Sequence, residues 1–298
     1  MKCGIVILNY NDFNMTSNLL EMIKEYDSLD KIIVVDNHST DGSYEKILEY
    51  KSDKIEVLRA LSNGGYSKGN NIGIKYVLNN TDIDIIGIAN SDVEFKRAFI
   101  ERIKKQFEER DDYAIISGLQ ISPEGNVANH PFWPEYTTKQ YFRMKLLSFH
   151  LVKHFLKPKW YQNYLMRKLG CENSFFRVGA VEGSLFFIRR KDIELTGLLD
   201  ENIFIYYEED ILAKKIKSIG RKIGVDSSAC YIHYGAGTTQ KVFSSKTKIN
   251  HKFYSSVYFF NKYQSDNKML QILNFLICEF LRVEEMILLS IKGLHEKK

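Results

Sequence analysis

The sequence has few of the residues that define several classes of protein. Only four cysteines occur in 298 residues, far apart and without a C-x-x-C pair, which argues against a disulfide framework and a cysteine-based zinc site. No tandem repeat or low-complexity tract is present. The longest charge-free stretch near the C-terminus, residues 269–278, is too short to span a membrane.

The bulk composition is that of a globular, soluble protein. With 44% hydrophobic and 27% charged residues, the chain can bury a large core in one large or two small domains. Because 42 Lys and Arg against 37 Asp and Glu give a net charge of only +5, no nucleic-acid partner is expected. The N-terminus runs directly into CGIVILNY without the features of a signal peptide, so we expect a cytoplasmic location.

Short runs rich in Val and Ile alternate with helix-compatible segments through the first 122 residues. Strands covered on both faces have such continuous apolar runs, and the intervening lengths suit crossover helices. We therefore predict an α/β fold with a Rossmann-like, mostly parallel central sheet flanked by helices. The predicted strands are CGIVILNY, KIIVVDN, KIEVLRA, DIIGIAN and YAIISGLQI.

Polar side chains follow two of these predicted strands. Asp36 and Asn37 follow IIVV, and Asp92 follows IIGIANS. The carboxyl ends of parallel strands share one edge of an open α/β sheet, where ligands bind. Asp36 is suited to accept hydrogen bonds from a base or ribose, and Asp92 to offer oxygen to a divalent cation that bridges phosphates. Each aspartate alone is equally typical of a helix N-cap or a turn.

A segment rich in glycine and asparagine, SNGGYSKGNNIGI, precedes a predicted helix. Its glycines do not form G-x-G-x-x-G directly after the first strand, which disfavours a nicotinamide-binding domain. Such a turn still lets the backbone approach a nucleotide closely.

The composition changes between residues 136 and 171. No Asp or Glu occurs there, and Lys and Arg are mixed with eight aromatic residues. This mixture suits peripheral docking on the inner face of the cell membrane, and it equally suits a basic face packed on the catalytic domain. From residue 254 onward the chain is predicted to be helical, and its last apolar segment is more typical of a packing or homodimer helix than of a lipid anchor.

Five motifs occur in the order found in family 2 glycosyltransferases of the GT-A fold: VVDNHSTDGS, SNGGYSKGNNIGI, NSD, GSLFFIRRKDIELTGLLDENIFIYYEEDILAKKI and YIHYGAG. Over roughly residues 3–240 the chain resembles the rhamnosyltransferase-like branch that builds bacterial surface polysaccharides. The resemblance implies a GT-A domain over 1–240, with a nucleotide-binding half (1–122), a basic aromatic insertion (123–177) and an acceptor and catalytic half (178–240). A C-terminal helical region would occupy 241–298.

By this resemblance, the predicted strand ends hold a nucleotide-sugar donor. Asp36 is expected to contact the base, and Asp92 matches the last position of a D-x-D-like signature whose carboxylate binds Mg²⁺ or Mn²⁺. Because Asn90 replaces the first Asp of that signature, we expect one carboxylate ligand instead of two. The residues assigned to nucleotide binding are Asn9, Asp36, Asn37, Asn63, Gly65, Asn71, Asn90 and Ser91.

The stretch YYEED carries the candidate catalytic base. Sugar transfer with inversion needs a carboxylate that takes the proton of the acceptor hydroxyl. The resemblance maps this base to Glu209, where the family has Asp. Glu208 and Asp210 remain competitors, and the three acids also favour a helix N-terminus through its dipole.

The resemblance adds a metal ligand and an acceptor side. His233 follows a predicted strand where the family often places a histidine near the metal and diphosphate, although an isolated histidine is more often structural. Glu182, Gly183 and Ser184 would line the acceptor side. The implied activity is inverting, metal-dependent transfer from a UDP- or dTDP-linked sugar to a hydroxyl of a glycan or lipid-linked acceptor.

Two other functions stay open from the sequence. A sugar nucleotidyltransferase would also need Asp36, Asp92 and a metal, but it usually carries a basic glycine-rich phosphate loop early in the chain, which NYNDFN does not provide. A non-catalytic carbohydrate-binding protein could share the fold, but retention of both Asp92 and YYEED argues against it.

Overall fold

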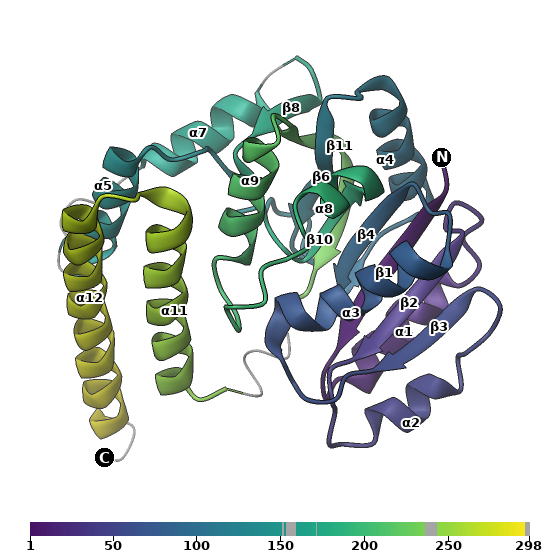
Figure 1. Ribbon diagram of the computed structural model, residues 1–298, viewed down its shortest axis with the longest axis horizontal. Coiled ribbons are helices and arrows are strands. Elements are labelled where there is room, and N and C mark those ends of the chain that lie inside the picture. Colours follow the sequence, from purple (N-terminus) through teal and green to yellow (C-terminus); the bar gives the residue numbers. More distant parts are fainter. Residues whose placement is uncertain (151, 153–158, 171, 236–242, 296–298) are drawn as a thin grey trace.

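A computed structural model describes residues 1–150, 152, 159–170, 172–235 and 243–295. Within these residues, nine strands form one sheet in the order β3-β2-β1-β4-β10-β6-β11-β5, with β8 also paired to β11 (Figure 1). The strands are β1 (Cys3–Asn9), β2 (Lys31–Asp36), β3 (Ile55–Arg59), β4 (Ile85–Asn90), β5 (Val93–Glu94), β6 (Tyr113–Ile121), β8 (Phe175–Val178), β10 (Leu185–Arg189) and β11 (Lys222–His233). A separate antiparallel pair joins β7 (Phe132–Trp133) and β9 (Ala180–Val181).

The strand directions bring several predicted site residues to one edge of the sheet. β1 pairs in parallel with both β2 and β4, and Asn9 lies opposite Asp36 while Leu8 lies opposite Asn90. β10 runs antiparallel between β4 and β6, and β6 pairs in parallel with β11. All five predicted strands are present, so the prediction of a mostly parallel central sheet is confirmed.

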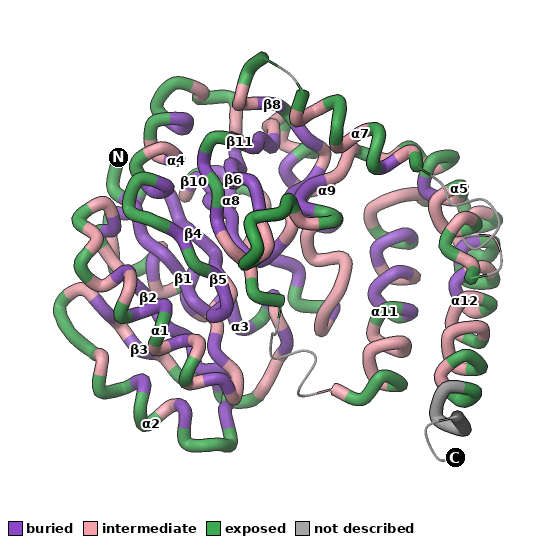
Figure 2. The backbone as a smooth tube through the Cα atoms, turned by 180° about the vertical axis from the view of Figure 1, so that it is seen from behind, coloured by how far each residue is buried: buried purple, intermediate pink, exposed green. Residues whose placement is uncertain are grey.

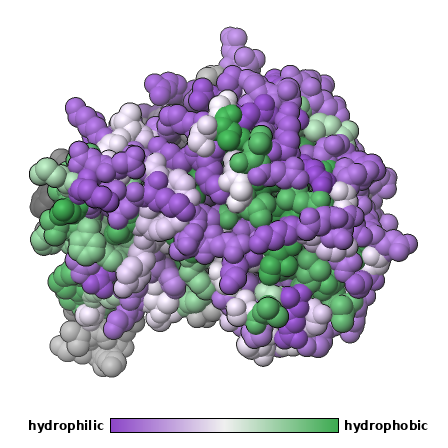
Figure 3. Space-filling model, viewed as in Figure 1, coloured by the Kyte–Doolittle hydropathy of each residue, from purple (hydrophilic) through white to green (hydrophobic). Residues whose placement is uncertain are grey.

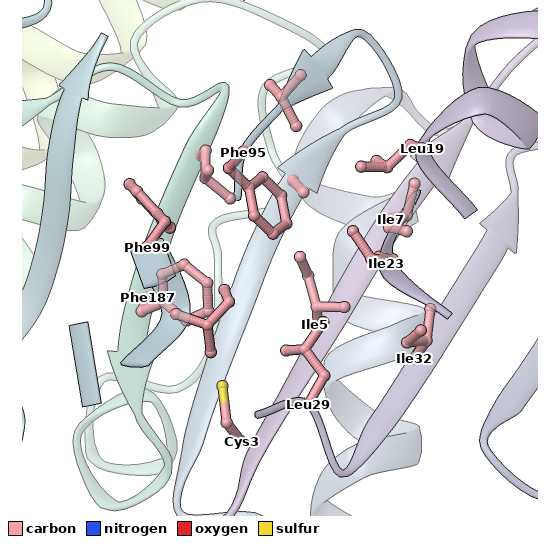
Figure 4. Close-up of a cluster of buried hydrophobic side chains, with 14 of the residues drawn as sticks. Cys3, Ile5, Ile7, Leu19, Ile23, Leu29, Ile32, Phe95, Phe99 and Phe187 are labelled. Carbon is pink, nitrogen blue, oxygen red and sulfur yellow. The ribbon is translucent and has the colours of Figure 1, made fainter. Parts of the chain in front are cut away.

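Helices cover both faces of the sheet, as Figures 1 and 2 show. One core cluster joins the sheet to α1 and α4, with side chains such as Ile5, Leu19, Phe99 and Phe187 (Figure 4), and a second joins the other face to α3, α8 and α9. Strands buried on both faces explain the continuous Val and Ile runs. The helices around the sheet are α1 (Phe13–Ile23), α2 (Ser43–Leu48), α3 (Gly65–Asn80), α4 (Arg97–Glu109), α8 (Arg190–Leu195) and α9 (Glu208–Ser218).

A helical arm lies beside this sheet. Its members are α5 (Thr138–Ser148), α7 (Trp160–Leu169), α11 (Ser245–Phe259), the π-helix η1 (Phe260–Gln264) and α12 (Lys268–His295). α11 and α12 pack against each other, α12 also contacts α5, and a third cluster joins Tyr141, Ile211 and Phe260. The predicted C-terminal helical extension is therefore present. Among the described residues, no helix is both long and apolar enough to cross a membrane.

Part of two predicted segments lies outside the described residues. These are 151, 153–158 and 171 of the basic aromatic segment, and 236–237 at the end of the YIHYGAG motif. The described part of the basic aromatic segment forms α5 and α7, and the chain then returns to the main sheet as β8.

Candidate active site

A closed hydrogen-bond network joins the ends of β1 and β2. Asn9 Nδ2 donates to Asp36 Oδ1 at 2.9 Å and to Ser39 Oγ at 3.1 Å. Thr16 Oγ1 donates to Asn9 Oδ1 at 2.8 Å, and Ser39 N donates to Asp36 Oδ2 at 2.9 Å. Asn9 and Asp36 are fully buried, so in this structure they hold the two loops together and offer no surface to a ligand.

A second network connects β2 to the start of α3. Asn37 Nδ2 donates to Asn63 Oδ1 at 2.9 Å and to Gly65 O at 3.2 Å. Gly65 has φ +84°, and a Cβ at this position would lie 2.1 Å from Phe204 O, so the close approach requires glycine. Tyr66 N donates to the same carbonyl at 3.0 Å. The edge of the sheet is thereby fixed against the segment that leads into α9.

Asn71, which we had grouped with the nucleotide-binding residues, contacts a different segment. Its Nδ2 donates to Leu199 O and to Glu201 Oε1, both at 2.9 Å, and Leu199 N donates to Asn71 Oδ1 at 3.1 Å. Both polar atoms of this buried side chain therefore have partners in the turn after α8. Asn71 therefore stabilises the turn after α8.

Asp92 and His233 meet at the carboxyl edge of the sheet. Asp92 lies between β4 and β5 beside the buried Ser91, and His233 is the last residue of β11. His233 Nε2 is 3.3 Å from Asp92 Oδ1, and Gln120 Nε2 is 2.7 Å from His233 Nδ1 on the opposite side of the ring. Gln120 therefore orients the imidazole, and which atom donates depends on the ring tautomer.

The charge state of this pair follows from its surroundings. Burial lowers the pKa of His233, but hydrogen bonding to Asp92 and the negative charges of Glu182 and Asp92 outweigh burial, so the net pKa is raised. Asp92 is 3% exposed, and its Oδ2 is buried without a hydrogen-bond partner among the described residues. A buried, unpartnered carboxylate oxygen is costly unless a cation or donor binds it.

The pair fits a divalent cation that is shared with a phosphate ligand. Within the described residues, no three His, Cys, Asp or Glu side chains form a metal-binding group. Protein ligands to a cation here would be Asp92 and His233, with other oxygens supplied by the substrate. Mg²⁺ is commonly bound in this way, through one or two carboxylates plus substrate phosphates.

The segment 182–184 contacts both the carboxyl end of β4 and the start of α9. Ser184 N donates to Glu182 Oε2 at 2.8 Å, and Gly183 N donates to Glu209 Oε1 at 3.2 Å. On the sheet side, Asn90 N donates to Ser184 O at 2.8 Å. Residues predicted separately for the nucleotide, the acceptor and the base therefore meet at one short segment.

The first two acids of α9 are half-buried and repel each other. Burial raises the pKa of Glu208 to about 7, and the negative charges of Glu182 and Asp210 act in the same direction. Burial, followed by the charges of Glu208 and Glu182, raises the pKa of Glu209 well above its ordinary value. Carboxylates with raised pKa values are suited to general acid–base chemistry.

Asp210 faces a different part of the molecule. Trp133 Nε1 donates to Asp210 Oδ1 at 2.9 Å, and burial outweighs this bond and raises the pKa of Asp210 to about 6. Both residues line a cavity of about 770 Å³ between α9 and the helical arm. Its aromatic lining includes Trp133, Tyr136, Tyr141, Tyr161, Tyr164 and Phe253. The three acids of YYEED are thus divided between two environments.

Several residues of the site were missed by the sequence reasoning. Tyr66 Oη donates to Gly183 O at 2.6 Å, and the half-buried Lys145 Nζ donates to Tyr207 Oη and Ser256 Oγ, both at 2.6 Å. Gln120 and Trp133 also belong to this group, through His233 and Asp210. Tyr66 lies inside a quoted motif, but no pattern distinguishes the others, because each acts through a partner distant in sequence.

The strand order, the carboxyl-edge aspartate and the acidic helix start together define a glycosyltransferase of the GT-A fold. The chain matches the model of glycosyl transferase family 2 over residues 4–160, just over half of its length. It therefore belongs to glycosyl transferase family 2, and the prediction of this family is confirmed.

Known relatives and structures agree with this assignment. Over 207 residues the chain is 28% identical to the low-salt glycan biosynthesis hexosyltransferase Agl10 of Haloferax volcanii, and the aligned region covers 69% of this chain and 58% of that protein. The fold of this chain is similar to that of S. aureus TarS 1–349 in complex with UDP-GlcNAc, with a TM-score of 0.56 and 14% identity over 92% of this chain and 70% of that chain. It is also similar to the mannosyltransferase PcManGT of Pyrobaculum calidifontis in complex with GDP-Man and Mn²⁺ (TM-score 0.57, 11% identity, 98% and 75%).

Proposed function

We propose that this glycosyltransferase moves a sugar with inversion from a UDP- or dTDP-linked donor to a hydroxyl group of a glycan or lipid-linked acceptor. The observation that carries the proposal is that Asp92 and His233 contact each other at the carboxyl edge of the sheet, that the charge of Glu182 acts on His233, and that the neighbouring Gly183 N donates to Glu209. Assembly of a bacterial capsule, O-antigen or related surface polysaccharide is the process implied by the sequence resemblance, and the similarity to a glycan biosynthesis hexosyltransferase of Haloferax volcanii supports such a process.

The donor is expected at the carboxyl edge of β1, β2 and β4. Asn37, Asn63, Gly65 and Asn90 shape this edge, while the buried Asn9–Asp36 pair supports it. Asp92 and His233 would hold Mn²⁺ or Mg²⁺, which would offset the negative charge of the departing diphosphate. The structures of PcManGT with GDP-Man and Mn²⁺ and of TarS with UDP-GlcNAc support a nucleotide-sugar donor and a divalent cation.

Glu209 is our proposed catalytic base. As the acceptor oxygen bonds to the anomeric carbon, the bond from that carbon to the diphosphate breaks, and the acceptor proton passes to a Glu209 oxygen. The Gly183 N–H bond to Glu209 Oε1 fixes the carboxylate beside the proposed acceptor residues Glu182 and Ser184. The environment of Asp210 favours a supporting role, because its Oδ1 accepts from Trp133 on the cavity side.

Two variants test this assignment with separate readouts. Asp92→Asn keeps the side-chain size but removes the carboxylate, so we expect Mn²⁺ binding in the presence of UDP or dTDP, measured by calorimetry, to weaken at least tenfold. Glu209→Gln is expected to keep that binding and lose turnover by about 10²–10⁴-fold. Full turnover in Glu209→Gln would transfer the base role to Glu208, and unchanged Mn²⁺ affinity in Asp92→Asn would contradict the metal assignment.

Product analysis separates the alternative functions. Incubation of the wild-type protein with a panel of nucleotide sugars and Mn²⁺ should release a nucleoside diphosphate. Release of pyrophosphate would indicate a sugar nucleotidyltransferase. Ligand binding without turnover on any donor and acceptor would indicate a non-catalytic carbohydrate-binding protein.

A further inference from the structure

The outer face of α12 is apolar along most of its length. From residue 272 to 291, every exposed residue of this helix is hydrophobic except Ser290. Phe280 is 67% exposed and Ile287 is 54% exposed, and Figure 3 shows hydrophobic side chains gathered at the left margin, where α12 lies in Figure 1. We call this the α12 stripe; its members are Met269, Ile272, Leu273, Phe275, Leu276, Phe280, Val283, Ile287, Leu288 and Ile291.

Three charged residues of α12 are turned toward the rest of the molecule. Glu285 pairs with Lys252 of α11 at 2.6 Å, Glu284 accepts from the backbone N of His150 at 2.9 Å, and Arg282 donates to Asn250 of α11 at 3.2 Å. These polar groups therefore lie on the inner side of the helix, while large apolar groups lie in solvent. Contiguous exposed apolar patches of this kind mark interaction surfaces.

The spacing within the α12 stripe is that of a helix that packs against another helix. Leu273, Leu276, Phe280, Val283 and Ile287 follow one another at alternating intervals of three and four residues. This is the a/d repeat of a coiled coil, which keeps one narrow seam facing a partner helix. An interfacial membrane helix has no need of this 3.5-residue repeat.

The available area matches a stable protein interface. The large side chains of the α12 stripe are roughly half exposed, so each offers about 80–100 Å² of solvent-accessible surface. The ten members together offer roughly 800 Å², which is what one partner contributes to a standard protein–protein interface.

The charges on α12 argue for a protein partner over an anionic lipid surface. Over its full length, Lys268–His295, the helix carries three basic residues, Lys268, Arg282 and Lys292, and three acidic residues, Glu279, Glu284 and Glu285. Amphipathic helices that lie on membranes are rich in Lys and Arg on the polar face, and in α12 the basic residues do not outnumber the acidic ones. A second copy of the chain presents the same apolar seam, which is what a two-fold interface requires.

We propose that α12 pairs with α12 of a second copy, forming a two-fold homodimer through the α12 stripe. The opposite side of α12 is already covered by α11 and α5. Figure 1 shows α12 on the far side of the molecule from β1, β2 and β3, so the dimer leaves the carboxyl edge of the sheet open. This proposal does not depend on the proposed chemistry of transfer.

Size-exclusion chromatography with light scattering tests the dimer. At micromolar concentration the wild-type chain should run at twice its 34.8 kDa mass. Phe280→Glu and Ile287→Glu should each run at the mass of one chain with unchanged far-ultraviolet circular dichroism. The matched control is Met166→Glu on α7, where a 67% exposed apolar side chain lies outside the α12 stripe, and this variant should stay dimeric.

Three results would overturn the proposal. One is a wild-type chain that runs as a monomer at every concentration up to the highest that stays in solution. Another is a dimer that persists in both glutamate variants. The third is a monomeric wild-type chain that co-sediments with phosphatidylglycerol vesicles while Phe280→Glu does not, which would assign the α12 stripe to a lipid surface.

Discussion

Replacing Glu208 with Gln should stabilise the protein while it damages the site. Glu208 Oε2 is buried without a hydrogen-bond partner among the described residues, and Glu182 and Asp210 repel the ionised carboxylate. Glutamine keeps the shape of the side chain and removes the charge. The substitution therefore removes an electrostatic cost that the folded chain carries at neutral and alkaline pH.

The size of the effect follows from the pKa of Glu208, which rises from 4.5 to about 7 on folding. At about 1.4 kcal/mol for each tenfold change in proton affinity, this rise corresponds to about 3 kcal/mol. Because the folded-state pKa is raised, the folded state binds the proton more tightly than the unfolded state. The cost of Glu208 is therefore absent below about pH 4.5, develops between pH 4.5 and 7, and is complete above pH 7.

Thermal unfolding at several pH values measures this prediction. At pH 8 the melting temperature of Glu208→Gln should exceed that of the wild type by several degrees, since about 1 kcal/mol shifts Tm by roughly 2–4 °C in proteins of this size. The difference should shrink toward zero near pH 4.5. Glu49→Gln, at an exposed position just after α2, is the matched control and should follow the wild type.

Two outcomes would refute the reasoning about Glu208. Equal melting temperatures at pH 8 would mean that the carboxylate is solvated or paired in the folded protein. A gain that is the same at pH 5 and pH 8 would have a cause other than ionisation. If Glu208→Gln is more stable than the wild type and also turns over more slowly, the pair of results shows the trade-off between stability and activity that is expected at active-site charges.

Two further substitutions test how the site is held. Gly65→Ala should lower the free energy of unfolding by at least about 2 kcal/mol more than Gly42→Ala, as measured by thermal unfolding. Both glycines have positive φ, but only at Gly65 would a Cβ lie against a backbone carbonyl. Equal losses of stability would contradict the close approach of Gly65 to Phe204. Lys145→Met should lower stability by about 2 kcal/mol, because Tyr207 and Ser256 lose a half-buried charged donor. The substitution Lys139→Met at an exposed position should not lower stability, and equal melting temperatures for wild type and Lys145→Met would show that Lys145 contributes no net stability.

The fold could be predicted because its signal is local and repeated. The strands β1, β2 and β4 are continuous apolar runs rich in Val and Ile that end in a polar residue, and covered parallel strands need such apolar runs. Parallel register then places the ends of β1, β2 and β4 at one edge without further information. Asp36 and Asn90 are the last residues of β2 and β4, and Asp92 lies two residues after the end of β4.

The internal arrangement of the site could not be predicted in the same way, because it depends on contacts between distant segments. Nothing local indicates that Asp210 accepts from Trp133 while Glu209 accepts from Gly183. Asn71 was grouped with nucleotide-binding residues because it lies in a motif, yet its partners are in the turn after α8. The exposure of the α12 stripe was equally hidden, since composition does not say which face of a helix is covered.

The strained backbone of the described residues is concentrated around the same site. Five residues other than glycine have positive φ, and four of them are next to site elements: Asn11 after β1, His38 after β2, and the consecutive Tyr206 and Tyr207 before α9. Such conformations cost of order 1–3 kcal/mol each and persist only where surrounding contacts enforce them. At Tyr207 one such contact comes from the half-buried Lys145 of α5, which donates to the Tyr207 hydroxyl. The helical arm therefore supports the turn that presents Glu208 and Glu209, and its packing on α9 is part of the construction of the active site.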